Sequence, residues 1–208
     1  MAASLRSDGA TALALGGDVT VEADVARAVD AVVGEWGSLD VLVNNAGIAL
    51  LAPAETAPLD DIRLVFEIDV FGVIAFAKEA FRPMRAQGKG SIINMASMAG
   101  ITVLRPQEHA GYNAAKAAVI MVSKSLAVEW AEFGIRVNAI APGYMLTPPV
   151  DKLRAEDPAR WSVWMADVPM ERAGNPDELQ GAAVYLASDS ASYVTGSVVV
   201  VDGGYSCA

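Results

Sequence analysis

Short runs of β-branched and other apolar residues alternate along the chain with longer stretches in which apolar residues recur at helical spacing. Apolar runs of this length predict strands buried on both faces, and such strands separated by helices are typical of a parallel sheet covered on both sides. We therefore predict a single α/β domain over residues 1–208, with a doubly wound, Rossmann-like parallel sheet. The strands are expected at 11–15, 39–43, 92–95, 137–141 and 198–201, and the helices at 21–34, 59–81, 111–133 and 177–187.

Four residues set the expected ends of these helices. Thr20 is expected to cap the first helix and Pro58 to lie at the start of the second. Pro83 is expected to end that second helix, and Gly134 to follow the third in the left-handed conformation.

Composition excludes several classes of protein. The chain has 15 Lys and Arg against 25 Asp and Glu, a net charge of −10, which disfavours a nucleic-acid partner. Its single Cys excludes a disulfide framework and a cysteine-based zinc site, so we expect no metal. No run approaches the roughly 20 apolar residues of a spanning helix, and residues 1–7 do not resemble a signal peptide. We expect a cytoplasmic protein with no membrane partner.

Ligands of parallel sheets bind where the strands end, so residues that follow the strands are the candidates for a site. Asn44-Asn45-Ala46-Gly47 follows the second predicted strand, and small residues there let a backbone approach a ligand closely. Ser97 follows the third strand. Taken alone, both features also fit an ordinary turn or a helix cap.

Tyr112 and Lys116 stand four residues apart near the start of a predicted helix, which places them on one face. An ammonium group beside a phenol lowers the phenol pKa from its ordinary value of about 10. A tyrosine tuned in this way can exchange a proton with an alcohol or a carbonyl group. The alternative is a tyrosine packed beside a lysine that reaches solvent.

Together these segments resemble the short-chain dehydrogenase/reductase family, in family order and over nearly the whole chain. The matching segments are Asp18-Val19-Thr20, residues 42–47, Ser97 ahead of residues 112–116, residues 136–143, and Thr195-Gly196 with Asp202-Gly203-Gly204. Within the family, Arg105-Pro106-Gln107 and the turn at 141–144 are similar to the enzymes that oxidise sugars and polyols.

The resemblance implies an oxidoreductase that moves a hydride between NAD or NADP and a secondary alcohol or ketone, chemistry that the cofactor supplies. Tyr112 would accept the proton of the alcohol, Lys116 would lower the tyrosine pKa and bind the nicotinamide ribose, and Ser97 would hold the substrate oxygen. The residues implied to contact the cofactor are Asp18 and Val19 at the adenine, Asn44, Ala46 and Gly47 along the adenosine, Tyr112 and Lys116, and Pro142, Gly143, Met145 and Thr147 at the nicotinamide end.

One catalytic position departs from the family pattern. Where the family usually has an asparagine that relays protons, this chain has Asp69. Asp69 can serve if the relay uses its backbone carbonyl. A carboxylate near Lys116 would also hold the lysine charged and offset part of its effect on Tyr112.

Three further residues are candidates for substrate contacts. Gln107 and His109 precede Tyr112 and are expected to hydrogen-bond the substrate, although His109 also fits a loop histidine with no partner. Trp164, with Trp161 and Met165, is expected either to cover the substrate or to pack an amphipathic segment.

No glycine-rich turn of the kind that binds a pyrophosphate precedes Asn44. We therefore expect an N-terminally truncated form of the fold, in which the first βαβ unit is largely absent. The family sheet has the order 3-2-1-4-5-6, so without strands 1 and 2 residues 11–15 would be a third strand that lacks its neighbour, and residues 39–43 would become an edge. We predict that residues 11–15 pair with residues 39–43, or that a partner chain covers this edge. In the family, the residue that separates NAD from NADP follows the second strand. That strand is not among these residues, so the sequence does not decide between the two cofactors.

Two functions follow from these observations. The first is an NAD(P)-dependent dehydrogenase of a sugar, polyol or similar alcohol, forming a homodimer or homotetramer through the helices at 59–81 and 111–133. The second is a catalytically impaired homologue that lacks the pyrophosphate turn and acts only as a structural or oligomer partner.

Overall fold

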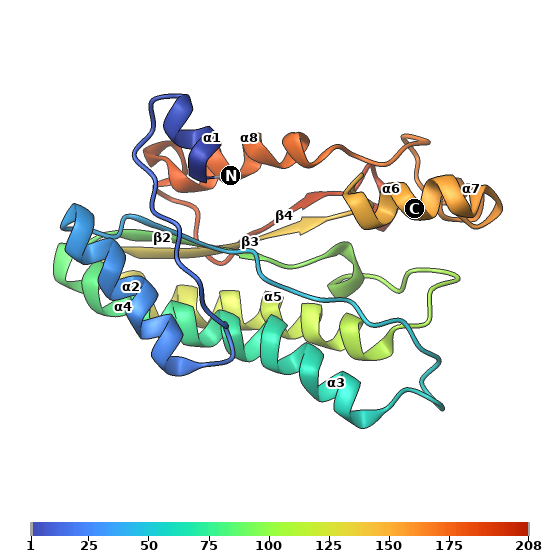
Figure 1. Cartoon of the computed structure of the whole chain (residues 1–208), viewed down its shortest axis with the longest axis horizontal. Helices are drawn as coiled ribbons and strands as arrows, with labels where there is room; N and C mark the ends of the chain where they lie inside the picture. Colours follow the sequence, from blue (N-terminus) through green and yellow to red (C-terminus); the bar gives the residue numbers. More distant parts are fainter. Residues whose placement is uncertain (1, 208) are drawn as a thin grey trace.

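Four parallel strands form one sheet in the order β1-β2-β3-β4 (Figure 1). The strands are β1 (Val41–Asn44), β2 (Gly90–Met95), β3 (Ile135–Pro142) and β4 (Val198–Val201). In the computed structural model, which describes residues 2–207, Leu42 pairs with Ile92, and Ile92 with Val137. Parallel pairing confirms the predicted sheet.

Helices cover both faces of this sheet. On one face lie α2 (Glu22–Trp36), α4 (Gly72–Gln87) and α5 (Ala110–Trp130), and on the other lies α8 (Gln180–Ala187) (Figure 1). Successive strand residues point to opposite faces. Ile92 accordingly packs with the first group of helices, and Ile93 packs against Leu186 of α8. The doubly wound arrangement is therefore confirmed.

The shorter elements surround the sheet. They are α1 (Ala2–Ser7), α3 (Leu59–Phe66), α6 (Pro148–Glu156), α7 (Pro158–Ala166), a π-helical turn at Glu67–Phe71, and 3₁₀ turns at Met98–Gly100, Ala131–Phe133, Pro176–Leu179, Asp189–Ala191 and Tyr205–Cys207. Helices α6 and α7 lie at the end of the sheet toward which the strands run (Figure 1). No helix within residues 2–207 combines the length and the apolar character needed to cross a membrane.

Two predicted helix ends are wrong. Thr20 does not cap α2, because its N–H and hydroxyl both donate to Asp18 Oδ1, and Val21 takes the cap position. Pro83 lies inside α4 and does not end it; the helix continues to Gln87 and ends at Gly88, with φ of 70°. A proline removes one backbone hydrogen bond, and the last turn of α4 is retained because Met84 packs fully buried in the core.

Other predicted boundaries hold or need refinement. Pro58 directly precedes α3, and Gly134 has φ of 73°, as expected of residues that flank helices. The helix predicted at 59–81 consists of α3, the π-helical turn and α4, and the one predicted at 177–187 begins as a 3₁₀ turn.

Residues 11–15 form no strand, which makes the prediction that they pair with residues 39–43 wrong. A strand needs a neighbour for its N–H and C=O groups. Within residues 2–207, the carbonyl of Ala12 instead accepts from the Arg6 guanidinium. Strand β1 is the edge of the sheet, and Val41 and Val43 are 36% and 47% exposed. Coverage of this edge by a partner chain remains a prediction.

Candidate active site

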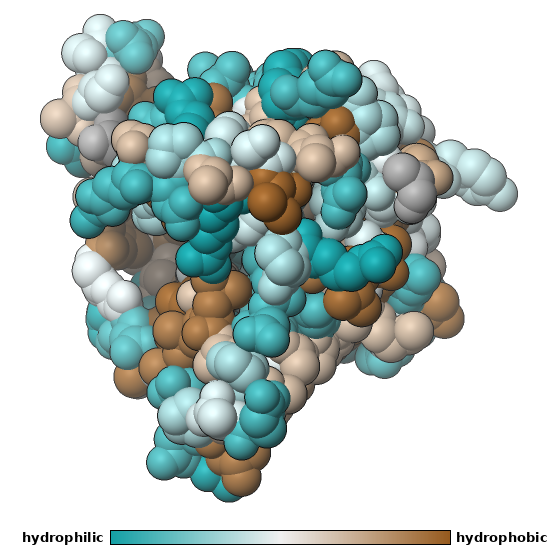
Figure 2. All heavy atoms as spheres, turned by 90° about the vertical axis from the view of Figure 1, so that its right-hand side faces the viewer, coloured by the Kyte–Doolittle hydropathy of each residue, from teal (hydrophilic) through white to brown (hydrophobic). Residues whose placement is uncertain are grey.

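The carboxyl ends of the strands open onto one face of the molecule, where hydrophobic and hydrophilic side chains are mixed (Figure 2). Ser97 follows β2 there and begins the 3₁₀ turn Met98–Gly100, with its hydroxyl accepting from the Ala99 N–H at 3.1 Å. A Cβ on Gly100 would lie 2.6 Å from the carbonyl carbon of Lys116. The turn that carries Ser97 is therefore packed directly against the backbone of α5.

Helix α5 presents Tyr112 and Lys116 on one face, as their spacing predicts. The Lys116 ammonium lies 5.6 Å from the centroid of the Tyr112 ring and donates to the carbonyl of Met95 at 3.0 Å. Only 5% of Lys116 is exposed. A lysine that is buried and bonded in this way is fixed in position beside the phenol.

Asp69 joins this group from the π-helical turn that separates α3 from α4. It is fully buried, its Oδ2 lies 3.0 Å from Lys116 Nζ, and its Oδ1 accepts from the Ile48 N–H at 2.8 Å. A Cβ on Gly47 would lie 3.0 Å from Asp69 Oδ2 and 3.3 Å from Lys116 Nζ. Glycine thus lets the loop after β1 approach the ion pair closely. The close approach to a ligand that the Asn44–Gly47 motif predicts stays a prediction.

Burial is the largest influence on Tyr112 and raises its pKa above the ordinary value. The hydrogen bond with Ser97 lowers the pKa, and the negative charge of Asp69 raises it. The Asp69 carboxylate also lies beside the Lys116 ammonium group, where it offsets part of the effect of that charge on the phenol.

A chain of buried side chains lies beneath these residues. Asn44 donates to Asn94 Oδ1 at 2.9 Å, and Asn94 donates to the Ser123 hydroxyl at 2.9 Å. The amide of Asn44 therefore ties β1 to β2, and its contact with a cofactor stays a prediction. Sequence reasoning gave Asn94 no role, although a polar residue inside an apolar strand is a signal of such a network.

A hollow of about 210 Å³ lies at the end of β1. Val19 and Ala46, both expected at the cofactor, line it together with Asn44 and Phe76. Asp18 lies in an exposed turn, where hydrogen bonds from the N–H and hydroxyl of Thr20 lower its pKa. Asp18 and Val19 together line a neighbouring hollow of about 110 Å³, which shares Val19 and Phe76 with the hollow at β1.

Residues 142–147, expected at the nicotinamide end, are held by backbone bonds on both sides. The Gly143 N–H donates to Val201 O at 2.9 Å, Met145 pairs with Gly174, and Thr147 takes the cap position of α6. Pro142 is the last residue of β3.

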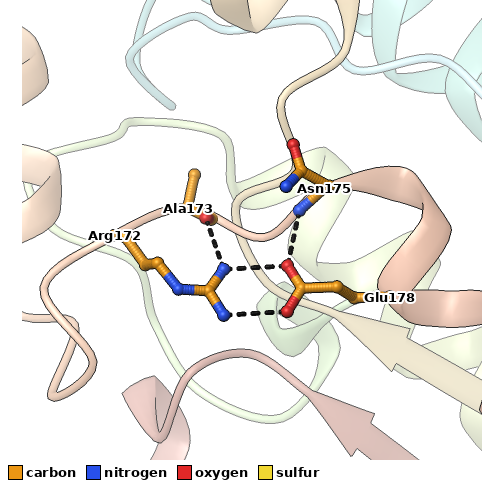
Figure 3. Close-up of polar contacts among 4 residues, drawn as sticks. All are labelled: Arg172, Ala173, Asn175 and Glu178. Carbon is orange, nitrogen blue, oxygen red and sulfur yellow. Dashed lines mark hydrogen bonds and ion pairs between the residues drawn. The ribbon is translucent and has the colours of Figure 1, made fainter.

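The strand-like segment at Gly174 is fixed in turn by a forked ion pair (Figure 3). Arg172 donates to both carboxylate oxygens of Glu178 at 2.8 Å, and Glu178 also accepts from the Asn175 N–H at 2.8 Å. These hydrogen bonds lower the pKa of Glu178 to about 2, and those from Arg172 have the largest effect.

Gln107 and Trp164, both predicted substrate residues, meet at Tyr144. The Tyr144 and Trp164 rings stack with centroids 5.1 Å apart. With its amide oriented to satisfy all its neighbours, Gln107 accepts from the Tyr144 hydroxyl and from Trp164 Nε1 at 3.0 Å. Tyr144 was expected only as part of a turn. Its contacts make it the centre of an aromatic wall beside the site.

His109 occupies the cap position of α5, one turn before Tyr112. Its ring centroid lies 5.6 Å from that of Tyr112, and only 6% of the residue is exposed. Burial lowers the pKa of the imidazole. The structure thus brings together Ser97, Tyr112, Lys116, Asp69 and Gly47, with His109 beside the Tyr112 ring.

Comparison with known proteins identifies the family to which this geometry belongs. The family described as enoyl-(acyl carrier protein) reductase matches residues 1–206. Cis-4-hydroxycyclohexanecarboxylate dehydrogenase of Sinomonas cyclohexanicum is 44% identical over 210 residues, covering 99% of this chain and 81% of that protein. The chain is a short-chain dehydrogenase/reductase. As such it is an oxidoreductase that depends on NAD or NADP.

Two further relatives of this short-chain dehydrogenase/reductase bear on its substrate. Galactitol 2-dehydrogenase (L-tagatose-forming) of Cereibacter sphaeroides is 43% identical over 188 residues, covering 90% of this chain and 73% of that protein. The structure of a gluconate 5-dehydrogenase from Burkholderia cenocepacia J2315, in complex with NADP and tartrate, superposes with a TM-score of 0.91. It is 37% identical, and the match covers 100% of this chain and 80% of that one.

Proposed function

We propose that this short-chain dehydrogenase/reductase oxidises a secondary alcohol group of a sugar or polyol with NAD or NADP, and reduces the ketone in reverse. The observation that carries the proposal is the meeting of Ser97, Tyr112 and Lys116, from the end of β2 and the first turns of α5. The galactitol dehydrogenase and the tartrate-bound gluconate dehydrogenase among its relatives support the choice of substrate class.

In this reaction Tyr112 takes the hydroxyl proton as the alcohol becomes a ketone, and returns a proton in the reverse direction. Ser97 hydrogen-bonds the same substrate oxygen and holds it toward the phenol. Lys116, which Asp69 and the Met95 carbonyl hold beside the ring, would stabilise the phenolate form of Tyr112.

The residues at the strand ends fit a dinucleotide at its two ends. When bound, NAD(P) supplies the ring that accepts the hydride from the alcohol carbon. Val19, Ala46 and Gly47 would hold the adenosine side, where the hollow at β1 lies and where Gly47 leaves space beside Lys116. Asn44 would support this wall and Asp18 would lie at the adenine. Tyr112 and Lys116 would contact the ribose, with Pro142, Gly143, Met145 and Thr147 at the nicotinamide end.

The substrate would lie between Ser97 and the aromatic wall of Gln107, Tyr144 and Trp164. Because the amide of Gln107 is already bonded within this wall, we infer that Gln107 and Trp164 shape the pocket. Helix α7, which carries Trp164, would cover the bound substrate.

The assembly we propose is a homodimer or homotetramer in the cytoplasm, formed through α3, α4 and α5. These helices and the turn between them expose apolar side chains that a second copy would bury. They are Leu64, Phe71, Met121 and Val128, exposed by 46%, 52%, 60% and 82%. Large apolar side chains that are exposed together on neighbouring helices are typical of protein interfaces.

A second function, that of a structural partner without catalysis, is favoured by one observation. No glycine-rich turn of the kind that binds a pyrophosphate precedes Asn44 within residues 1–208. Residues 1–208 on their own would keep the oligomer surface while binding cofactor weakly or not at all.

Cofactor titration followed by a turnover assay separates the two functions. NAD⁺ and NADP⁺ are titrated to millimolar concentration against the quenching of tryptophan fluorescence, and galactitol, xylitol and gluconate are then offered as substrates. We expect at least one cofactor to bind and to be reduced. We expect the rate of this reduction to fall by about 10²-fold to 10⁴-fold in Tyr112→Phe. Absence of binding at millimolar cofactor would leave the structural role.

A further inference from the structure

His109 stands next to the proposed base but takes no part in the chemistry described so far. It caps α5 at the turn that precedes Tyr112, and the two ring planes are inclined by 54° with centroids 5.6 Å apart. A molecule bound at the Tyr112 hydroxyl would therefore lie close to the imidazole.

Both nitrogens of this imidazole are buried, and neither has a hydrogen-bonding partner among residues 2–207. Buried polar side chains in folded proteins are almost always hydrogen-bonded, because an unpaired one loses its water without compensation. Two unpaired nitrogens on a residue that is 94% buried, beside a catalytic tyrosine, point to a ligand that supplies the missing partners.

Three other side chains assigned to the substrate or to Tyr112 are already engaged. Gln107 bonds within the aromatic wall, and Lys116 bonds to Met95 and Asp69. Ser97 accepts from the Ala99 N–H and is assigned to the reacting oxygen. Compared with these three, His109 keeps both a donor and an acceptor for a second group of the substrate.

The chemistry of the imidazole selects the kind of group. Burial favours the neutral ring, which has one N–H donor and one acceptor nitrogen. The two nitrogens point away from each other, so one ligand group can pair with only one of them. A hydroxyl group can donate to the acceptor nitrogen or accept from the N–H, whereas a carboxylate can pair only with the N–H. The neutral ring therefore accommodates a hydroxyl at whichever nitrogen faces the substrate, and an acid group at only one of the two.

Resting on the dehydrogenase activity proposed above, we propose that His109 binds the hydroxyl group next to the reacting carbon, so that the enzyme recognises a vicinal diol. Ser97 and Tyr112 hold the oxygen that is oxidised, and His109 holds its neighbour. This role makes His109 a determinant of specificity and gives it no part in proton transfer.

Two alcohols that differ by one hydroxyl test this assignment. The kcat/KM for 2,3-butanediol and for 2-butanol is measured with the wild type, His109→Leu and His109→Gln. The leucine keeps the side-chain volume but removes both nitrogens, and the glutamine keeps a donor and an acceptor. Glu108→Gln, on the exposed neighbouring residue, is the control. We expect the wild type to prefer the diol, His109→Leu to lose about tenfold on the diol and less than twofold on 2-butanol, and His109→Gln to recover part of the loss.

The outcomes separate this proposal from the one on which it rests. The role of His109 is overturned if His109→Leu keeps the diol preference. It is also overturned if His109→Leu loses activity on both alcohols equally and His109→Gln restores activity on neither. Both results leave the dehydrogenase activity standing. A wild type that oxidises neither alcohol nor any of the sugars and polyols offered overturns both.

Discussion

Asp69 Oδ2 lies 3.0 Å from Lys116 Nζ, with 0% and 7% of the two side chains exposed. The resemblance to the family leads one to expect an asparagine at this position, and the exchange adds a negative charge beside the lysine that acts on Tyr112. At this burial the charge is weakly screened by water. The Asp69 charge therefore raises the Tyr112 pKa directly, and beside Lys116 it offsets part of the effect of the ammonium group on the phenol.

Asp69→Asn is expected to move the pH dependence of alcohol oxidation to lower pH. Tyr112 acts as a base only when deprotonated, and removing the negative charge lowers its pKa, so the rise of kcat with pH begins earlier. The measurement is kcat between pH 5 and pH 10, with circular dichroism at each pH because breaking a buried ion pair also destabilises the fold. Asp61→Asn, on an exposed residue of α3, is the control. Identical profiles for Asp69→Asn and the wild type would show that the carboxylate does not tune the base.

Gly100→Ala is expected to reduce both stability and activity. The new methyl group would lie 2.6 Å to 2.7 Å from backbone atoms of Lys116 and Ala117, which cannot move without shifting α5. We expect a loss of about 1–3 kcal/mol in the free energy of unfolding and a lower kcat, because Ser97 and Lys116 move apart. Urea unfolding and steady-state kinetics measure the two effects.

The matched control for this substitution is Gly181→Ala in α8, where an added Cβ meets nothing within 4 Å. An alanine in an exposed helix stabilises by up to about 1 kcal/mol relative to glycine. If Gly100→Ala were as stable and as active as Gly181→Ala, the close packing of the Ser97 turn on α5 would not matter for the site.

Much of this site could be predicted because its residues stand next to one another in the sequence or at strand ends. Tyr112 and Lys116 are one helical turn apart, and Ser97 follows a strand whose apolar run is easily recognised. What could not be predicted comes from contacts between distant segments. Tyr144 reaches Gln107 across 37 residues, and no local pattern indicates that the amide is used there.

The fold shows the same division between local and distant information. Strand and helix periodicity predicted the elements of the core, because burial of one face dictates the pattern. At Pro83 local propensity favours a helix end, but the packing of Met84 retains the last turn. At residues 11–15 local propensity favours a strand, but no neighbouring strand lies beside them within residues 2–207. Tertiary context decided both cases.

Glu178→Gln is expected to destabilise the protein at neutral pH but not in strong acid. The pKa of Glu178 is about 2 in the folded protein, below the ordinary value of 4.5. The ion pair with Arg172 therefore stabilises the fold fully above about pH 4.5, and this contribution is lost as the pH falls toward 2. The difference in unfolding free energy between the wild type and the variant should therefore shrink over that interval. Urea unfolding at pH 7, 4.5, 3.5 and 2.5 measures it, with Glu129→Gln, an exposed residue of α5, as control. A difference that does not depend on pH would contradict the ion-pair assignment.

Val43→Lys is expected to reduce self-association of the chain through the open edge of the sheet. Val43 is 47% exposed on β1, whose outer side has no neighbouring strand within the described sheet. An apolar edge of this kind can pair with the edge of another chain, and a lysine at such a position hinders the pairing because its charge would have to be buried. Static light scattering during mild heating should show a slower rise for Val43→Lys than for the wild type.

Val184→Lys, on the exposed face of α8, adds the same charge away from the edge and should aggregate like the wild type. Equal slowing in both variants would assign the effect to net charge, and no slowing in Val43→Lys would show that β1 is not the surface through which copies meet.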